Sequence, residues 1–143
     1  MIKTQHVYPD KVIKDFKKSK KAKIELNDCS VRAIAVASGM SYDKAHQFVE
    51  KHFDRKFCKG TYDYIETLNK LSSKSVKLNR KTLETIPCKM NVGSFIKYYT
   101  KGTYIISVSG HTFVIKNGIV FGNKEDSIKL RRPIQGLWKV GSK

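Results

Sequence analysis

Residues 27–39 read NDCSVRAIAVASG, a polar turn that leads directly into a segment with apolar residues on nearly every side of a helix. A helix of this kind is normally buried in the middle of a fold. Asp28 or Asn27 can cap its start, and Gly39 is a natural stop. We therefore expect a buried central helix over residues 28–38, with the rest of the chain packed around it.

Cys29 is predicted to lie in the first turn of this helix. Unpaired backbone N–H groups and the positive end of the helix dipole favour a thiolate at that position. A thiol there is a candidate nucleophile, which needs a base, a group that orients the base, and donors for an oxyanion. The alternative interpretation is a small core residue, the usual role of a lone cysteine in an apolar helix.

The 143 residues predict one domain with its own core. We expect a basic N-terminal arm or helix in residues 1–26, a helical part in residues 27–102 and an antiparallel sheet in residues 103–143. Helices are expected over 10–23, 42–53, 62–71 and 92–100, a helical turn over 82–86, and strands over 104–108, 111–115, 119–122, 127–130 and 133–140. Helices followed by strands predict an α+β fold, with the buried central helix packed on the sheet.

The charge balance is strongly basic, with 29 Lys and Arg against 12 Asp and Glu and a net charge of +17. This balance predicts attraction to polyanions such as nucleic acid or an acidic polymer. The densest group of lysines is Lys14, Lys17, Lys18, Lys20, Lys21 and Lys23, and further basic positions are Lys51, Arg55, Lys56 and Lys59. The alternative interpretation is a solvated surface helix that runs into a basic loop. Lysine outnumbers arginine, which argues against base-specific reading of DNA.

The cysteines Cys29, Cys58 and Cys88 are odd in number and widely spaced, so no disulfide framework is predicted. Their spacing gives no zinc motif, and we expect no metal or other cofactor. Cys58 and Cys88 are interpreted as structural or surface residues, and His46 and His52 as surface or helix-end histidines. The sequence shows no leader and no membrane-length apolar run, which predicts a cytoplasmic protein without a membrane partner. The small size and lysine-rich composition are typical of a phage-encoded protein, which we would expect to act in the host cell.

His111 stands at the start of an expected strand, and the following hairpin decides which residue faces it. A two-residue turn pairs Lys116 with Ile119 and places His111 opposite Lys124. A three-residue turn with a glycine bulge, which the Lys-Asn-Gly sequence favours, sets His111 against Asn123. Asn123 can then accept a hydrogen bond from the imidazole and fix its tautomer. Asp126, slightly further along the chain, is the second choice for this role.

The order of a helix-start cysteine, a strand histidine and an asparagine resembles the papain-like cysteine peptidase superfamily, particularly its compact bacterial and phage branches. Asp28-Cys29-Ser30 is similar to the Asp-Cys-Ser of NlpC-type cell-wall hydrolases. Asn27-Asp28-Cys29 with Val31-Arg32-Ala33, and GHTFVI at residues 110–115, are similar to bacteriocin-processing peptidases. The resemblance covers residues 27–123.

The resemblance implies that Cys29 is the nucleophile, His111 the general base and acid, and Asn123 the orienting residue. Papain-like enzymes usually carry an oxyanion glutamine where this chain has Lys23. Asn27, together with the backbone N–H of Cys29, is the expected substitute. The implied function is a thiol hydrolase that cleaves an amide bond in a peptide, isopeptide or peptidoglycan substrate. The alternative is a catalytically inactive papain-like protein, or another basic protein, that binds nucleic acid or a host protein.

Overall fold

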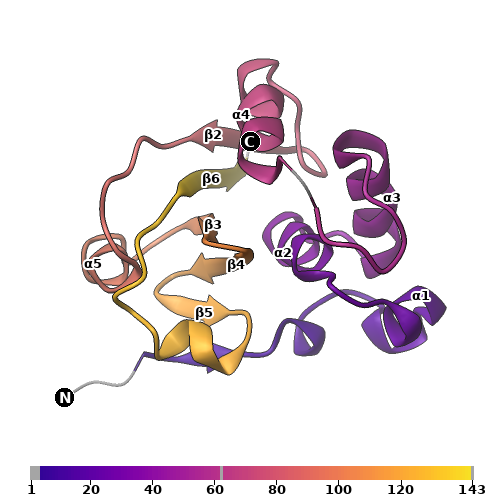
Figure 1. The fold of residues 1–143 in the computed structure, drawn as a ribbon, viewed down its shortest axis with the longest axis horizontal. Coiled ribbons are helices and arrows are strands. Elements are labelled where there is room, and N and C mark those ends of the chain that lie inside the picture. The colour runs from indigo at the N-terminus through magenta and orange to yellow at the C-terminus, as the bar shows by residue number, and fades with distance from the viewer. Residues whose placement is uncertain (1–3, 62, 143) are drawn as a thin grey trace.

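The computed structural model describes residues 4–61 and 63–142, and in it helices pack on a six-stranded sheet (Figure 1). The strands are β1 (His6–Val7), β2 (Lys81–Thr85), β3 (Thr103–Val108), β4 (His111–Lys116), β5 (Ile119–Phe121) and β6 (Gly136–Ser142). Their order across the sheet is β1-β5-β4-β3-β6-β2. Neighbouring strands are antiparallel except β1 and β5, which are parallel. The α+β class is confirmed, and the sheet is mixed rather than purely antiparallel.

The helical elements lie between Pro9 and Ser127, and strand β6 follows the last of them. The α-helices are α1 (Lys20–Ile24), α2 (Cys29–Ser38), α3 (Tyr42–Phe53), α4 (Tyr64–Ser73) and α5 (Val92–Tyr98). Short 3-10 helices are η1 (Pro9–Lys11), η2 (Phe16–Lys18) and η3 (Lys124–Ser127). None of the helices in the described part of the chain is both long and apolar enough to cross a membrane.

The central helix α2 agrees with the sequence prediction. It begins at Cys29, and Gly39 ends it with a left-handed φ of 79°. Val31 and Ile34 are completely buried, because α3 packs on one side of α2 and strands β3 and β4 on the other. α3 also has its predicted bounds, and the Ser41 side chain caps it by accepting a hydrogen bond from the Lys44 N–H.

The sheet separates two apolar clusters, as the alternation of side chains along a strand requires. Ile105 and Val114 pack with α2, α3 and α4, whereas Ile106 and Phe113 pack with α5. Figure 1 shows this arrangement with the sheet between α5 and the group of α2 and α3. The first residues of α2 and β4 thereby meet at one end of the helix–sheet interface.

Three predicted elements are wrong. Residues 82–86 form most of β2 instead of a helical turn, since Leu83 pairs with Val140 of β6 and buries its side chain. Residues 127–130 form the end of η3 and a turn instead of a strand, and Ile128 remains 64% exposed because no sheet face covers it. The expected helix over 10–23 is divided into η1, η2 and α1, with Asp15 in the left-handed region at φ 57°.

Candidate active site

Cys29 is the first residue of α2, where the backbone N–H groups have no intrahelical acceptor. The first hydrogen bond of the helix runs from the Arg32 N–H to the Asp28 carbonyl at 3.0 Å. The N–H of Cys29 therefore points out of the helix start, along the positive end of the helix dipole. This is the position that the sequence predicted for a reactive thiol.

His111 is the first residue of β4, directly after the turn at Gly110, whose φ is 70°. Burial alone raises the pKa of the Cys29 thiol, but hydrogen bonds from His111 and from the Thr112 backbone N–H lower it below its ordinary value. Burial alone lowers the pKa of His111, but hydrogen bonds to Asp126 and Cys29 raise it to about 9. These directions favour a thiolate–imidazolium pair at neutral pH.

Asp126 holds the far side of the imidazole. His111 Nε2 donates to Asp126 Oδ2 at 2.8 Å, which leaves Nδ1 for the Cys29 thiol. Asp126 is 1% exposed, and it also accepts from the Asn123 backbone N–H at 2.8 Å and from Arg132 Nη2 at 2.9 Å. Burial raises the pKa of Asp126, but His111 and Arg132 lower it below its ordinary value overall. The carboxylate therefore stays ionised and fixes the imidazole tautomer.

The prediction that Asn123 contacts the imidazole is wrong, because the hairpin has the other register. Lys116 pairs with Ile119, and the two-residue turn places Asn117 at φ 50° and Gly118 at φ 79°. β5 ends at Phe121, and the chain turns into η3. This turn brings Asp126 to the imidazole, while Asn123 contributes its backbone N–H to the carboxylate. Asn123 remains a lining residue of the cleft.

Gly122 is a site residue that the sequence analysis did not single out. A Cβ atom at this position would lie 2.5 Å from Asp126 Oδ2 and 2.8 Å from Phe113 Cβ. Any larger residue would therefore displace the carboxylate or the strand. Its carbonyl also accepts a hydrogen bond from His6 Nε2 at 2.7 Å, which ties β1 to the site. The glycine at the end of the expected strand 119–122 was the available signal, since glycine in a strand often marks a close approach.

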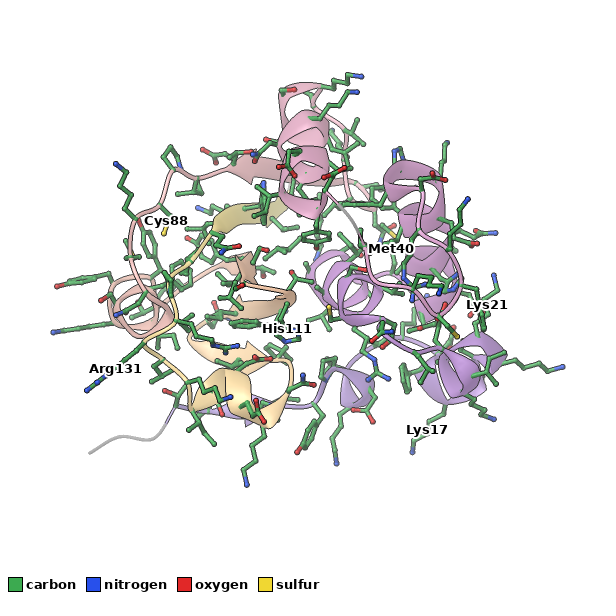
Figure 2. The ribbon with its side chains drawn as sticks, viewed as in Figure 1. Lys17, Lys21, Met40, Cys88, His111 and Arg131 are labelled. Atoms are coloured by element: carbon green, nitrogen blue, oxygen red, sulfur yellow. The ribbon has the colours of Figure 1, made fainter. Side chains whose placement is uncertain are left out.

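Cys29 and His111 line one cleft of about 800 Å³. Its walls come from the segment before η1, the loop before α4, the first turn of α4 and the turn after β5, through Tyr8, Thr61, Tyr64 and Gly122 among others. Figure 2 shows His111 between the sheet and α2. Its volume is within the range of clefts that bind small ligands.

Asn27, the expected oxyanion donor, lines the same cleft in a left-handed conformation with φ 53°. Its side-chain amide donates to the Cys58 carbonyl at 3.2 Å. Its oxyanion role stays a prediction, since an amide nitrogen carries a second hydrogen. Asp28 does not cap α2 with its side chain but accepts from Arg32 Nε at 3.0 Å and from the Tyr42 hydroxyl at 2.7 Å.

The lysines of the proposed polyanion surface lie in the N-terminal part of the chain and are mostly exposed. Lys21 is half-buried, and the others are exposed, namely Lys14, Lys17, Lys18, Lys20 and Lys23. Figure 2 shows Lys17 and Lys21 at the α1 side of the molecule, away from His111.

Two residues expected at the surface are buried instead. Arg55 is 4% exposed and forms an ion pair with Glu25, and His46 is 2% exposed beside the same carboxylate. Arg55 therefore does not belong to a basic binding surface. The single charged residue Glu25, far from both in sequence, explains why each of them is buried.

Among residues 4–61 and 63–142, no group of three or more His, Cys, Asp or Glu side chains is arranged to hold a metal ion. No family model matches the chain, and neither the curated proteins nor the solved structures include a match. The interpretation of function therefore depends on the geometry around Cys29, His111 and Asp126.

Proposed function

We propose that the protein is a papain-like thiol hydrolase that cleaves an amide bond in a peptide, isopeptide or peptidoglycan substrate. The observation that carries the proposal is the imidazole of His111, which hydrogen-bonds the Asp126 carboxylate at 2.8 Å and lines the same cleft as Cys29. A nucleophile, a base and a group that orients the base are the parts that covalent acyl transfer needs. They lie beside a cleft that is open to a substrate.

The proposed reaction begins when His111 takes the proton of the Cys29 thiol. The thiolate attacks the amide carbonyl carbon, so that a C–S bond forms and the carbonyl electron pair moves to oxygen. The Cys29 N–H stabilises this oxyanion, and one such donor is typically worth ~10²–10³ in rate. The imidazolium protonates the leaving nitrogen as the C–N bond breaks. Water, deprotonated by His111, then hydrolyses the thioester and releases the thiolate.

Asp126 takes the role that the resemblance gave to an asparagine. A buried carboxylate on the far ring nitrogen holds the imidazole in one tautomer and stabilises the imidazolium. Arg132 and the Asn123 N–H occupy its remaining acceptor sites and keep it ionised.

The test is the pH dependence of iodoacetamide alkylation, followed at each cysteine by mass spectrometry. We expect Cys29 to react well below the ordinary cysteine pKa of about 8.5, and to lose this reactivity in His111→Ala. Cys58 and Cys88 are internal references in the same sample. The proposal is wrong if Cys29 is no more reactive than these two.

Amide cleavage is then tested directly on an unfolded protein substrate and on purified peptidoglycan. Cys29→Ala is the matched control, since it removes the sulfur and leaves the rest of the cleft in place. Release of new amino groups by the wild type and not by Cys29→Ala is the expected result. Equal release by both would assign the activity to a contaminant.

A second proposal is that the exposed lysines of residues 14–23 bind a polyanion such as nucleic acid or an acidic polymer. The observation in its favour is that five of these six lysines are exposed and that Lys17 and Lys21 lie together at the α1 side of the molecule (Figure 2). Phosphate contacts make such binding weaken steeply with salt. We expect charge reversal at Lys17, Lys18, Lys20 and Lys21 to abolish DNA or heparin binding and to leave Cys29 alkylation unchanged.

A further inference from the structure

A buried ion pair lies just before the nucleophile and takes no part in the proposed chemistry. The side chains of Glu25 and Arg55 are both fully buried. Arg55 donates from Nη1 to Oε2 at 2.8 Å and from Nη2 to Oε1 at 3.0 Å. His46 contacts Oε2, and the Cys58 N–H donates to Oε1 at 2.9 Å. Buried charges are costly unless they are paired and fully hydrogen-bonded, and this carboxylate meets both conditions.

Arg55 also reaches the backbone that leads to Cys29. Its Nη2 donates to the Leu26 carbonyl at 3.0 Å and lies 3.4 Å from the Asn27 carbonyl. In the opposite direction, the Asn27 side chain donates to the Cys58 carbonyl at 3.2 Å. Asn27 is in the left-handed region at φ 53°, a conformation that asparagine tolerates better than most residues. Hydrogen bonds in both directions therefore hold residues 26–27 against the loop of residues 55–58.

Fixing these carbonyls also fixes the N–H groups that follow them. In a planar trans peptide the C=O of one residue and the N–H of the next point in opposite directions. The Arg55 contact with the Asn27 carbonyl therefore orients the Asp28 N–H. The Asp28 carbonyl is bound in turn by the Arg32 N–H at 3.0 Å, which orients the N–H of Cys29 out of the helix. Arg55 thus orients the Asp28 N–H, and the first hydrogen bond of α2 orients the Cys29 N–H.

We infer that Arg55 and Glu25 are positioning residues for the oxyanion site: Arg55 orients the Asp28 N–H, adjacent in the chain to the Cys29 N–H, through the Asn27 carbonyl, and Glu25 orients Arg55. The inference rests on the proposed thiol chemistry at Cys29. The inference assigns the two ion pairs different roles. The His111–Asp126 pair activates the sulfur of Cys29, and the Glu25–Arg55 pair determines how strongly the backbone N–H groups stabilise an oxyanion.

Two reactions of the same sulfur distinguish these parts. Alkylation by iodoacetamide forms a C–S bond and expels iodide, and no charge develops on an oxygen. Addition of Cys29 to the aldehyde N-acetylglycinal forms a C–S bond and moves the carbonyl pair to oxygen, which then takes the imidazolium proton. Only the second reaction places a developing oxyanion at the backbone donors. The extent to which the aldehyde protects Cys29 from iodoacetamide therefore measures how well the site stabilises an oxyanion.

The decisive variant is Arg55→Lys, because an ammonium keeps the charge opposite Glu25 but lacks the planar fork that also reaches the carbonyls. We expect the aldehyde concentration for half-protection to rise by roughly tenfold or more, since an oxyanion donor is worth ~10²–10³ when removed completely. The alkylation rate without aldehyde, and its pH midpoint, should stay as in the wild type. Arg131→Lys, at an exposed arginine, is the matched control and should change neither quantity.

Glu25→Gln is the second variant, for the case in which Arg55→Lys fails to fold. Glutamine keeps the shape of Glu25 and one acceptor oxygen for Arg55 but loses the charge, so we expect a weaker effect in the same direction. Wild-type protection in the folded variants, or no protection of the wild type, would overturn the inference while leaving the proposed function in place. Equal loss of alkylation and protection would also overturn it. An unreactive wild-type Cys29 would instead refute the proposed function itself.

Discussion

Two carboxylate–imidazole–arginine clusters lie within residues 4–61 and 63–142, and of these two the Asp126 cluster faces the cleft. Asp126 binds His111 and Arg132, and Glu25 binds His46 and Arg55. In the second cluster both ring nitrogens of His46 are within hydrogen-bond distance of carboxylates, since Nδ1 lies 3.0 Å from Glu50 Oε1. In the first, Nδ1 of His111 is left for the Cys29 thiol.

The exposure of the side chains follows the same division. The His111 side chain is 20% exposed and that of Arg132 27%, whereas those of His46 and Arg55 are 3% and 0% exposed. The same chemical groups therefore form an open cluster around Asp126, where His111 faces the cleft, and a closed cluster around Glu25, where His46 and Arg55 are enclosed. A substitution in the closed cluster should reduce stability, and one in the open cluster should reduce the reactivity of Cys29.

The largest expected effect is on stability, from Arg55→Met. This change leaves the Glu25 carboxylate buried without its ion pair, which typically costs ~3–5 kcal/mol. Arg132→Met is the matched change in the open cluster, and we expect only ~1 kcal/mol because Arg132 makes one partly exposed hydrogen bond to Asp126. Urea unfolding followed by circular dichroism measures both. Equal losses of unfolding free energy in the two variants would contradict the assignment of stability to the closed cluster and reactivity to the open one.

The next effect is on the pH dependence of stability, through the Glu25 carboxyl group. Burial raises the pKa of Glu25, but Arg55 and His46 outweigh it and lower the pKa to about 2. A lowered folded-state pKa stabilises the protein above the unfolded value and loses this effect as the pH falls through about 2. The contribution at neutral pH is ~3 kcal/mol.

Glu25→Gln should therefore lower the free energy of unfolding at pH 7 and flatten its decrease toward acid pH. The measurement is urea unfolding at a series of pH values. Glu84→Gln, at an exposed carboxylate of β2, is the control and should retain the wild-type slope. A wild-type slope in Glu25→Gln would show that Glu25 titrates normally.

A smaller effect sharpens the description of the open cluster. Asp126→Asn removes the charge that stabilises the His111 imidazolium and should slow Cys29 alkylation at pH 7 by roughly tenfold, which corresponds to ~1.4 kcal/mol. Asn123→Ala should leave the alkylation profile unchanged, because His111 Nε2 bonds Asp126. The opposite ranking of the two variants would restore Asn123 as the orienting residue.

The smallest effect is expected from Tyr64→Phe. The Tyr64 hydroxyl is buried beside the cleft, and within the described part of the chain it has no hydrogen-bond partner at bonding distance. Removing a buried polar group that makes no bond changes stability by less than ~1 kcal/mol, in either direction. A clearly larger loss in urea unfolding would reveal a bond that this hydroxyl makes in solution.

The sequence alone was sufficient for elements whose signals are local. The bounds of α3 follow from the Ser41 cap and an apolar stripe, and the end of α2 follows from Gly39. The positions of Cys29 at a helix start and His111 at a strand start follow from the same kind of signal. These features depend on neighbours within a few residues, so no knowledge of the fold is needed to predict them.

The tertiary structure decided what depends on distant partners. A shift of one residue in the hairpin register changes every residue opposite β4, and the packed sheet selected the two-residue turn. That choice exchanged Asn123 for Asp126 at the imidazole. Residues 81–85 became a strand because β6 offered them an edge. Arg55 and His46 are buried because the carboxylate of Glu25 pairs with both of them. Glu25 lies 21 residues before His46 and 30 residues before Arg55, and pairing over such sequence distances leaves no local signal.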